Sequence, residues 1–385
     1  MGHPIVIIPG LGGSLLVNKK QPIKRVFHRD IIDNRWLNIH PYSPSYMIKW
    51  KDEMRCEFEY GEGGQIIGYK NYDKNIQPYD IFGIKGIQNM VGDFDLLNKT
   101  HQDVFENMFH YKYFYELNQR LLKKGYLPRS NLIGFPWDFR LILDPVLRHH
   151  TFDMLRFKIE SVVKYHEERV VIVSHSLGGV LTKWFLEEQG AEWSEKYIRH
   201  LVMSNTPFGG SPSAIKALLI GEYYVPFFNK FFVDELRVNS GIVMGLPNLI
   251  SYNHKDVFWK TDNDEIITLH DFHKDKPNNI GFKLWHDMYS PYLYGSIQKK
   301  NSVPVTLINS SGIETPNTYI SKSLHEMPYK VLNDDGDSII PTRSLLVGKE
   351  LFPKHKYIEL KKVSHSEIIS HPVFLDYIID TWAES

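Results

Sequence analysis

Ser176 stands at the centre of the stretch Ser174-His175-Ser176-Leu177-Gly178, a variant of the G-x-S-x-G pattern that surrounds nucleophilic serines. A serine hydroxyl attacks esters efficiently only when a histidine takes its proton, and a carboxylate must hold that histidine in the productive tautomer. The pattern therefore predicts a nucleophile at Ser176 and requires an acid and a histidine elsewhere in the chain.

The residues on either side of Ser176 predict a strand that turns sharply into a helix. Residues 170–173 form a continuous β-branched run, which is typical of a strand buried on both faces of a parallel sheet. Beyond the serine, apolar residues recur at helical spacing, at Leu177, Val180, Leu181 and Trp184. This turn would set the hydroxyl at a helix N-terminus, where developing negative charge is favoured.

Two late segments offer the acid and the histidine in the chain order Ser, Asp, His. Asp337 lies in an acidic loop, residues 333–341, directly after a short apolar strand at residues 331–332. His365 follows an expected strand at residues 357–360. We therefore expect Ser176, Asp337 and His365 to be catalytic. The neighbouring alternatives are Asp334, Asp335 and His371.

A glycine-rich turn near the N-terminus is the candidate for binding a developing oxyanion. Residues 5–8 predict a buried strand, and the turn Pro9–Ser14 follows at once. Glycines let backbone N–H groups approach a ligand closely, and the absence of the P-loop lysine excludes a phosphate loop of that type. We expect the N–H groups of Leu11 and Leu177 to form the oxyanion hole. An ordinary strand-to-loop turn is the alternative.

Strands and helices alternate along the rest of the chain, which predicts a mostly parallel, doubly wound α/β sheet in one domain spanning residues 1–385. Further strands are expected at residues 132–135, 198–204 and 303–308, and helices at 104–124, 151–166 and 372–382. Residues 18–100 lack clean periodicity and are expected to be an insertion outside the core, facing a membrane or acting as a lid. Residues 212–300 are expected to be an aromatic-rich cap.

The cap contains a dense aromatic segment, residues 222–234. Its Phe228 and Phe231 are expected to contact acyl chains or a lipid surface, because aromatic rings combine an apolar body with tolerance of a wet edge. Burial of these rings in the core is the alternative.

Composition excludes several classes of partner and compartment. Lys+Arg 45 balance Asp+Glu 45, so no basic field is available to attract nucleic acid. No apolar run approaches the roughly 18–20 residues of a membrane span, and the N-terminus does not resemble a signal peptide. The single cysteine, Cys56, excludes an intramolecular disulfide and favours a reducing compartment. We expect a cytoplasmic protein that can contact membranes peripherally; nothing indicates its oligomeric state.

No cofactor or metal is expected. The acidic loop around Gly336 does not have the spacing of a calcium-binding EF-hand loop. His270 and His273 could share one helix face, but no further ligands accompany them.

Six short segments together resemble the lecithin:cholesterol acyltransferase-like family, which includes the lysosomal phospholipase A2 and the phospholipid:diacylglycerol acyltransferases. The segments are VIIPGLGGSLL (6–16), PWDFRL (136–141), SHSLGG (174–179), NTPFGGS (205–211), DDGDSIIPTRS (334–344) and SHS (364–366). The resemblance implies an α/β-hydrolase fold with a cap and a lid. It also implies substrate contacts at Phe208 and at Trp36, whose Trp-Leu pair is similar to that of the family's lid. The lid disulfide of well-known members cannot form here.

The resemblance and the residues together predict a serine lipid esterase, phospholipase A-like, that forms an acyl-serine and passes the acyl group to water or to an alcohol. Two alternatives stay open. One is a soluble carboxylesterase acting on non-lipid esters, and the other is a catalytically silent lipid-binding protein on a hydrolase fold.

Overall fold

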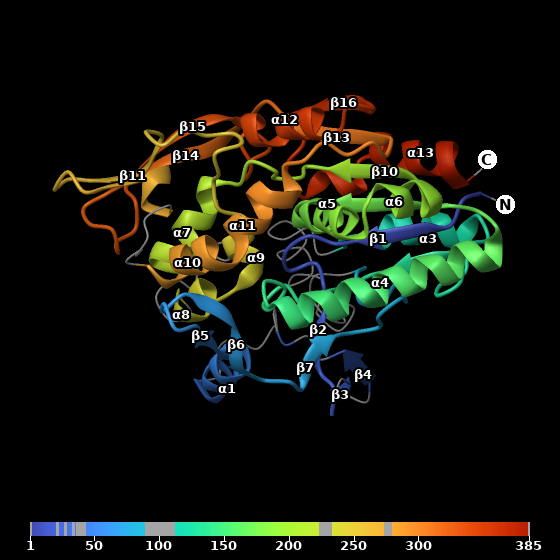
Figure 1. The fold of residues 1–385 in the computed structure, drawn as a ribbon, viewed down its shortest axis with the longest axis horizontal. Coiled ribbons are helices and arrows are strands. Elements are labelled where there is room, and N and C mark those ends of the chain that lie inside the picture. Colours follow the sequence, from blue (N-terminus) through green and yellow to red (C-terminus); the bar gives the residue numbers. More distant parts are fainter. Residues whose placement is uncertain are drawn as a thin grey trace.

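The computed structural model describes residues 2–20, 23–26, 29–32, 35, 44–88, 112–222, 233–272 and 279–383. Its centre is a six-stranded sheet with the order β16-β13-β10-β9-β1-β8, in which all neighbouring strands are parallel (Figure 1). The strands are β1 (Ile5–Ile8), β8 (Leu132–Gly134), β9 (Val170–His175), β10 (Ile198–Ser204), β13 (Val305–Ser311) and β16 (His355–Lys361). The predicted parallel sheet is confirmed.

The two faces of this sheet bury separate apolar cores, because successive side chains of a strand point to opposite faces. On β1, Val6 and Ile8 pack in the core that includes residues of α4 (Pro145–His166) and α5 (Leu177–Gln189). Ile5 and Ile7 pack in the other core, with residues of α3 (Tyr115–Lys123) and α13 (Pro372–Ile378). Helices therefore cover both faces, and the α/β-hydrolase fold class is confirmed.

Helix α4 begins earlier than the predicted residue 151, because the chain supplies a start signal at Asp144. The Asp144 carboxylate accepts hydrogen bonds from the N–H groups of Val146 and Leu147, and Pro145 follows it at the first helical position. The other Asp144 oxygen accepts the N–H of Tyr69, at 2.9 Å. The same carboxylate thus caps a helix and anchors a strand of the first insertion.

Three antiparallel strand pairs and a helix are formed by the described part of residues 16–78, which follow β1 in the chain. They are β2 (Leu16–Asn18) with β7 (Ile76–Pro78), β3 (Ile23–Val26) with β4 (Arg29–Ile32), and β5 (Cys56–Tyr60) with β6 (Ile66–Tyr72), with α1 (Pro44–Met54). Phe58 and Tyr69 are buried in the core on the α4 and α5 side of the sheet, called the main core below, with ring centroids 5.1 Å apart. The expectation that this stretch lies outside the core is therefore wrong for these residues.

A second sheet, with the order β12-β11-β14-β15, lies beside the central one (Figure 1). Its strands are β11 (Val257–Thr261), β12 (Ile266–Thr268), β14 (Ile313–Ser321) and β15 (Lys330–Gly336). The sequence predicted only the two residues at 331–332 of β15 and none of β14. Both strands mix polar with apolar residues, and most of β15 is exposed, so neither has the continuous apolar run of a buried strand.

Helices and helical turns complete the described chain. They are α6 (Ala191–Tyr197), α7 (Pro212–Ile220), α8 (Val233–Arg237), α9 (Ser240–Met244), η2 (Leu269–Phe272), α10 (Ile280–Leu284), η3 (Trp285–Tyr289), α11 (Ser290–Tyr292), η4 (Leu293–Ile297), α12 (Thr342–Leu351), η5 (Glu367–Ser370) and η6 (Ile379–Ala383). The two chain ends lie together, where His3 N–H donates to the Trp382 carbonyl (Figure 1). Within the described ranges, no helix is both long and apolar enough to cross a membrane.

Candidate active site

Ser176 forms the predicted sharp turn between β9 and α5. Its backbone has φ 55° and ψ −134°, a region that residues other than glycine rarely occupy and that is frequent at active sites. Hydrogen bonds hold this conformation, because Ser176 N–H donates to the Ser204 carbonyl and Gly179 N–H donates to the Ser176 carbonyl, each at 2.9 Å. A Cβ on Gly178 would lie 2.4 Å from the Ile8 carbonyl oxygen, so glycine is required where the turn passes β1.

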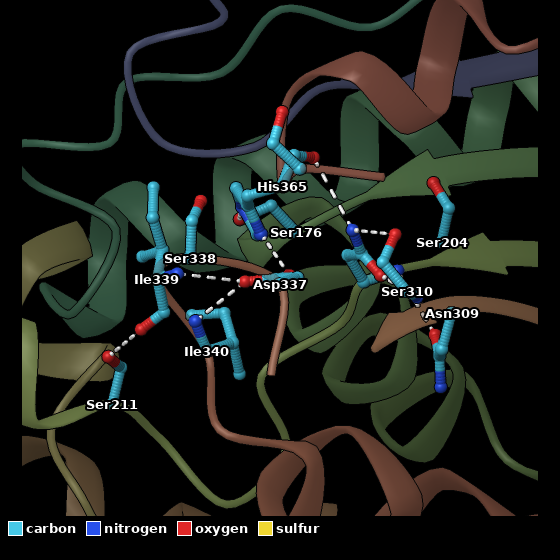
Figure 2. Close-up of polar contacts among 12 residues, drawn as sticks. Ser176, Ser204, Ser211, Asn309, Ser310, Asp337, Ser338, Ile339, Ile340 and His365 are labelled. Carbon is cyan, nitrogen blue, oxygen red and sulfur yellow. Dashed lines mark hydrogen bonds and ion pairs between the residues drawn. The ribbon is translucent and has the colours of Figure 1, made fainter. Parts of the chain in front are cut away.

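The three residues expected to be catalytic are joined by hydrogen bonds. His365 Nε2 lies 2.9 Å from Ser176 Oγ, and His365 Nδ1 lies 2.6 Å from Asp337 Oδ2. All three side chains are buried. The second Asp337 oxygen accepts the backbone N–H groups of Ile339 and Ile340, at 3.0 and 2.7 Å (Figure 2). These contacts fix the carboxylate in the orientation that meets the histidine.

The neighbouring alternatives have other partners. Asp334 accepts a hydrogen bond from Arg343, and Asp335 accepts one from the Thr342 hydroxyl. The ring of His371 accepts the N–H of Val373 at the start of α13. Asp337 is therefore the aspartate of this loop that contacts His365, although it follows a strand of the second sheet.

The glycine-rich turn after β1 lies directly beside Ser176. A Cβ on Gly10 would lie 2.7 Å from Ser176 Cβ, and the turn closes through a bond from Gly13 N–H to the Gly10 carbonyl. Within the part of the chain that is described, no hydrogen bond occupies the N–H of Leu11 or of Leu177. Leu177 follows Ser176 in the chain and Leu11 follows Gly10, the residue packed against Ser176; their role as oxyanion donors stays a prediction.

The expected substrate contacts are mostly untested by the structure. Phe208 is buried in the main core, where its ring centroid lies 6.1 Å from that of Phe352. The Phe208 side chain thus belongs to the core near Phe352. Its contact with substrate stays a prediction. Trp36, Phe228 and Phe231 lie outside the described residues.

Three residues that the sequence did not single out support His365. The His365 carbonyl accepts His175 Nε2 at 2.8 Å and Asn205 Nδ2 at 3.4 Å. His175 Nδ1 in turn lies 2.6 Å from the Tyr113 hydroxyl. Burial, and secondarily the nearby His365, hold the pKa of His175 well below its usual value. His175 occupies the variable position before the serine in the pattern, Asn205 opens the family-like segment 205–211, and Tyr113 belongs to no pattern considered.

No group of three or more histidine, cysteine or acidic side chains suited to a metal ion occurs in the described ranges. His270 is described, whereas its expected companion His273 is not. Cys56 is a free, buried thiol, and burial raises its pKa to about 12.

Comparison with known proteins gives a consistent set of relatives. The chain is 24% identical over 393 residues to the lysosomal phospholipase A and acyltransferase of Mus musculus, covering 97% of this chain and 89% of that protein. It is 23% identical over 396 residues to the phosphatidylcholine-sterol acyltransferase of Homo sapiens, covering 98% and 84%. Among solved structures, a chain of the Tle4–Tli4 complex is 10% identical, with 97% and 96% covered and a TM-score of 0.49.

The sequence model of the lecithin:cholesterol acyltransferase family matches residues 95–298, which is more than half of the chain. The resemblance inferred from the six short segments is thereby confirmed. The chain belongs to the lecithin:cholesterol acyltransferase family.

Proposed function

We propose that this protein is a serine lipid esterase, phospholipase A-like, in which Ser176, His365 and Asp337 are the catalytic triad. The observation that carries the proposal is the continuous hydrogen-bonded series from Ser176 Oγ through the His365 ring to Asp337, starting at a strained turn. Family membership and the activities named for the relatives support the same reaction class.

The geometry accounts for each proton in the reaction. In the resting enzyme, Ser176 Oγ–H donates to His365 Nε2 and His365 Nδ1–H donates to Asp337. As Oγ attacks an ester carbonyl, His365 takes the serine proton, and the buried Asp337 carboxylate stabilises the resulting imidazolium. The N–H groups of Leu11 and Leu177 would stabilise the negative oxygen of the tetrahedral intermediate.

His365 then gives its proton to the departing alcohol, which leaves an acyl group on Ser176. Water or a second alcohol attacks this acyl-serine, again with His365 as the base, and releases a free or transferred acyl group. The relatives are named for phospholipase A and for acyl transfer, so we infer that the acyl donor is a glycerolipid.

The proposed function is tested on mixed liposomes by mass analysis of the lipids that are lost and gained. A fluorophosphonate, which modifies activated serines, should label the protein at Ser176 and stop turnover. Loss of phospholipid with gain of free or transferred acyl chains is the expected result. Labelling without lipid turnover, together with hydrolysis of a dissolved short ester, would favour the soluble carboxylesterase. Absence of both labelling and turnover, with liposome binding retained, would favour the silent lipid-binding protein.

The insertions are proposed to meet the lipid, with residues 18–100 as a lid and 212–300 as a cap. Trp36, Phe208, Phe228 and Phe231 are the proposed contacts. Replacing Phe228 and Phe231 together by serine should weaken liposome hydrolysis while sparing a small soluble ester. A parallel fall of both activities and of the melting temperature would instead assign these rings to the core.

The cytoplasmic location expected from the sequence is not supported by the relatives, because the mouse protein is named lysosomal. It stays a prediction. Fractionation of cells that express the native chain would test it, with membrane-associated protein expected if peripheral contact occurs.

A further inference from the structure

A second hydrogen-bonded series runs next to the triad and joins the two sides of the active site. Gly10 N–H, in the glycine-rich turn after β1, donates to the Tyr113 hydroxyl at 2.9 Å. The same hydroxyl lies 2.6 Å from His175 Nδ1, and His175 Nε2 lies 2.8 Å from the His365 carbonyl oxygen. Tyr113 and His175 are both buried, and neither takes part in the proton transfers of the proposed mechanism.

The direction of every hydrogen in this series follows from its ends. The His365 carbonyl can only accept, so His175 carries its proton on Nε2. A neutral imidazole then has Nδ1 free to accept, and the Tyr113 hydroxyl donates to it while accepting from Gly10. Burial keeps the pKa of His175 well below its usual value, so the ring is neutral as this arrangement requires.

Close packing leaves Tyr113 little freedom. A Cβ on Gly13 would lie 2.5 Å from Tyr113 Cε1, and one on Gly10 would lie 3.1 Å from its hydroxyl. The Tyr113 and His175 rings meet edge to face, with centroids 5.4 Å apart, and the His175 and His365 rings lie 4.8 Å apart. The glycine-rich turn therefore packs tightly against Tyr113, and the Tyr113 ring packs against His175.

We propose that Tyr113 and His175 are positioning residues that hold the oxyanion turn and the catalytic histidine in a fixed mutual arrangement. The inference rests on the proposed function. The oxyanion donors and the base come from loops that lie far apart in the chain, and both must be correctly placed around Ser176 at once. A displacement of about 1 Å between such groups can cost on the order of 100-fold in rate. Asn205 also holds the His365 carbonyl, but over a longer distance and without a link to the turn.

The main test is Tyr113→Phe, which keeps the ring and removes the hydroxyl. We expect kcat for a soluble ester to fall about 10- to 100-fold with KM nearly unchanged, because positioning affects the reaction more than ground-state binding. Tyr126→Phe is the matched control. Tyr126 is also buried and donates its hydroxyl to a backbone carbonyl, that of His3, at the end of the molecule where the termini meet. The Tyr126→Phe variant should have a lower melting temperature than the wild type but an unchanged kcat.

A second pair of variants tests the His365 arm. His175→Gln retains a side-chain N–H that can reach the His365 carbonyl, whereas His175→Leu does not. The glutamine variant should therefore keep more kcat than the leucine variant. The double variant Tyr113→Phe, His175→Leu should be little worse than His175→Leu alone, because both substitutions interrupt one series.

Wild-type kcat in Tyr113→Phe would overturn the proposal, as would an equal loss of kcat in Tyr126→Phe. Equal activity of the glutamine and leucine variants would remove His175 from it. If the His175 variants fail to fold, Tyr113→Phe and its control still decide the question. Failure of the proposed function is recognised separately on the wild-type protein, which would then either leave liposome lipids intact or neither react with a fluorophosphonate nor hydrolyse an ester.

Discussion

Asp337 holds His365 through the main chain as well as through the side chain. The N–H of His365 donates to the Asp337 carbonyl at 2.7 Å, while His365 Nδ1 lies 2.6 Å from Asp337 Oδ2. One residue at the end of β15 therefore determines both where the histidine loop lies and how its ring is turned. A substitution that alters only the carboxylate should leave the loop in place and still impair the ring.

Asp337→Asn should consequently lower kcat far more than it lowers stability. An amide cannot stabilise the imidazolium as a carboxylate does, and it can favour the wrong histidine tautomer, an effect worth about 10⁴-fold in a well-studied serine hydrolase. Asp335→Asn is the matched control, because Asp335 is exposed and bonds to Thr342 rather than to His365. Steady-state hydrolysis of a soluble ester measures both variants. Equal losses would show that the wrong aspartate has been assigned.

The two serines of the Ser174-His175-Ser176 stretch provide the next prediction. Ser176→Ala should lower kcat by several orders of magnitude and abolish fluorophosphonate labelling, since it removes the oxygen on which the proposed acyl intermediate forms. The Ser174 hydroxyl is buried and has no hydrogen-bond partner among the described residues. Ser174→Ala should therefore retain activity and melt at the same or a higher temperature. Near-normal turnover in Ser176→Ala would refute the nucleophile.

The sequence predicted the parts of this site that leave local patterns. Strand β9, the turn at Ser176 and helix α5 follow from a β-branched run, small residues and helical spacing within about twenty positions. Asp337 was found from chain order, although the sheet that carries it was not predicted. Strand β14 mixes polar with apolar residues, and β15, which precedes Asp337, is mostly exposed, so neither has the continuous apolar run of a buried strand.

The supporting residues were missed for a different reason. Tyr113 and His175 are separated by 62 positions, and His175 and His365 by 190, so no spacing in the sequence indicates that they meet. The sequence alone also does not tell whether an aromatic side chain lies in the core or contacts the substrate. Phe208 was expected at the substrate from a family-like segment, and only the structure shows its ring packed near Phe352.

Two glycines should respond oppositely to alanine. A Cβ on Gly178 would press on the Ile8 and Pro9 carbonyl oxygens, at 2.4 and 2.5 Å, so Gly178→Ala should cost about 1–3 kcal/mol and displace Ser176. Gly295 is exposed in η4 and would have no atom within 4 Å of an added Cβ. Gly295→Ala should stabilise the protein by about 0.5–1 kcal/mol by restricting the unfolded chain. Denaturant unfolding and esterase activity measure both. Stability unchanged in Gly178→Ala would mean that the turn is not tightly packed there.

Stability should decrease as the pH falls below neutrality, because the partly buried His200 and the buried His175 are held neutral in the folded state. Burial, with the nearby Arg199 and Lys356, lowers the pKa of His200 from 6.5 to about 4. Its ring bonds to the Thr306 hydroxyl and lies 4.6 Å from the ring of Trp382. Burial also lowers the pKa of His175. In each case the unfolded chain binds a proton at a pH where the folded protein does not.

The sign of the effect follows directly. Above about pH 6.5, His200 is neutral in both the folded and the unfolded state, and it contributes no pH dependence. Between that pH and about 4, the unfolded state binds more protons at His200, so lowering the pH stabilises the unfolded state relative to the folded one. The cost from His200 alone can approach about 3 kcal/mol at the lower end of this range. Melting temperatures measured from pH 7.5 to 4.5 should fall, and His200→Gln should flatten the curve even if it melts lower at neutral pH. His150→Gln, on an exposed face of α4, should leave the slope unchanged. A wild-type protein equally stable at pH 7 and pH 5, or a His200→Gln curve as steep as the wild type, would contradict this assignment.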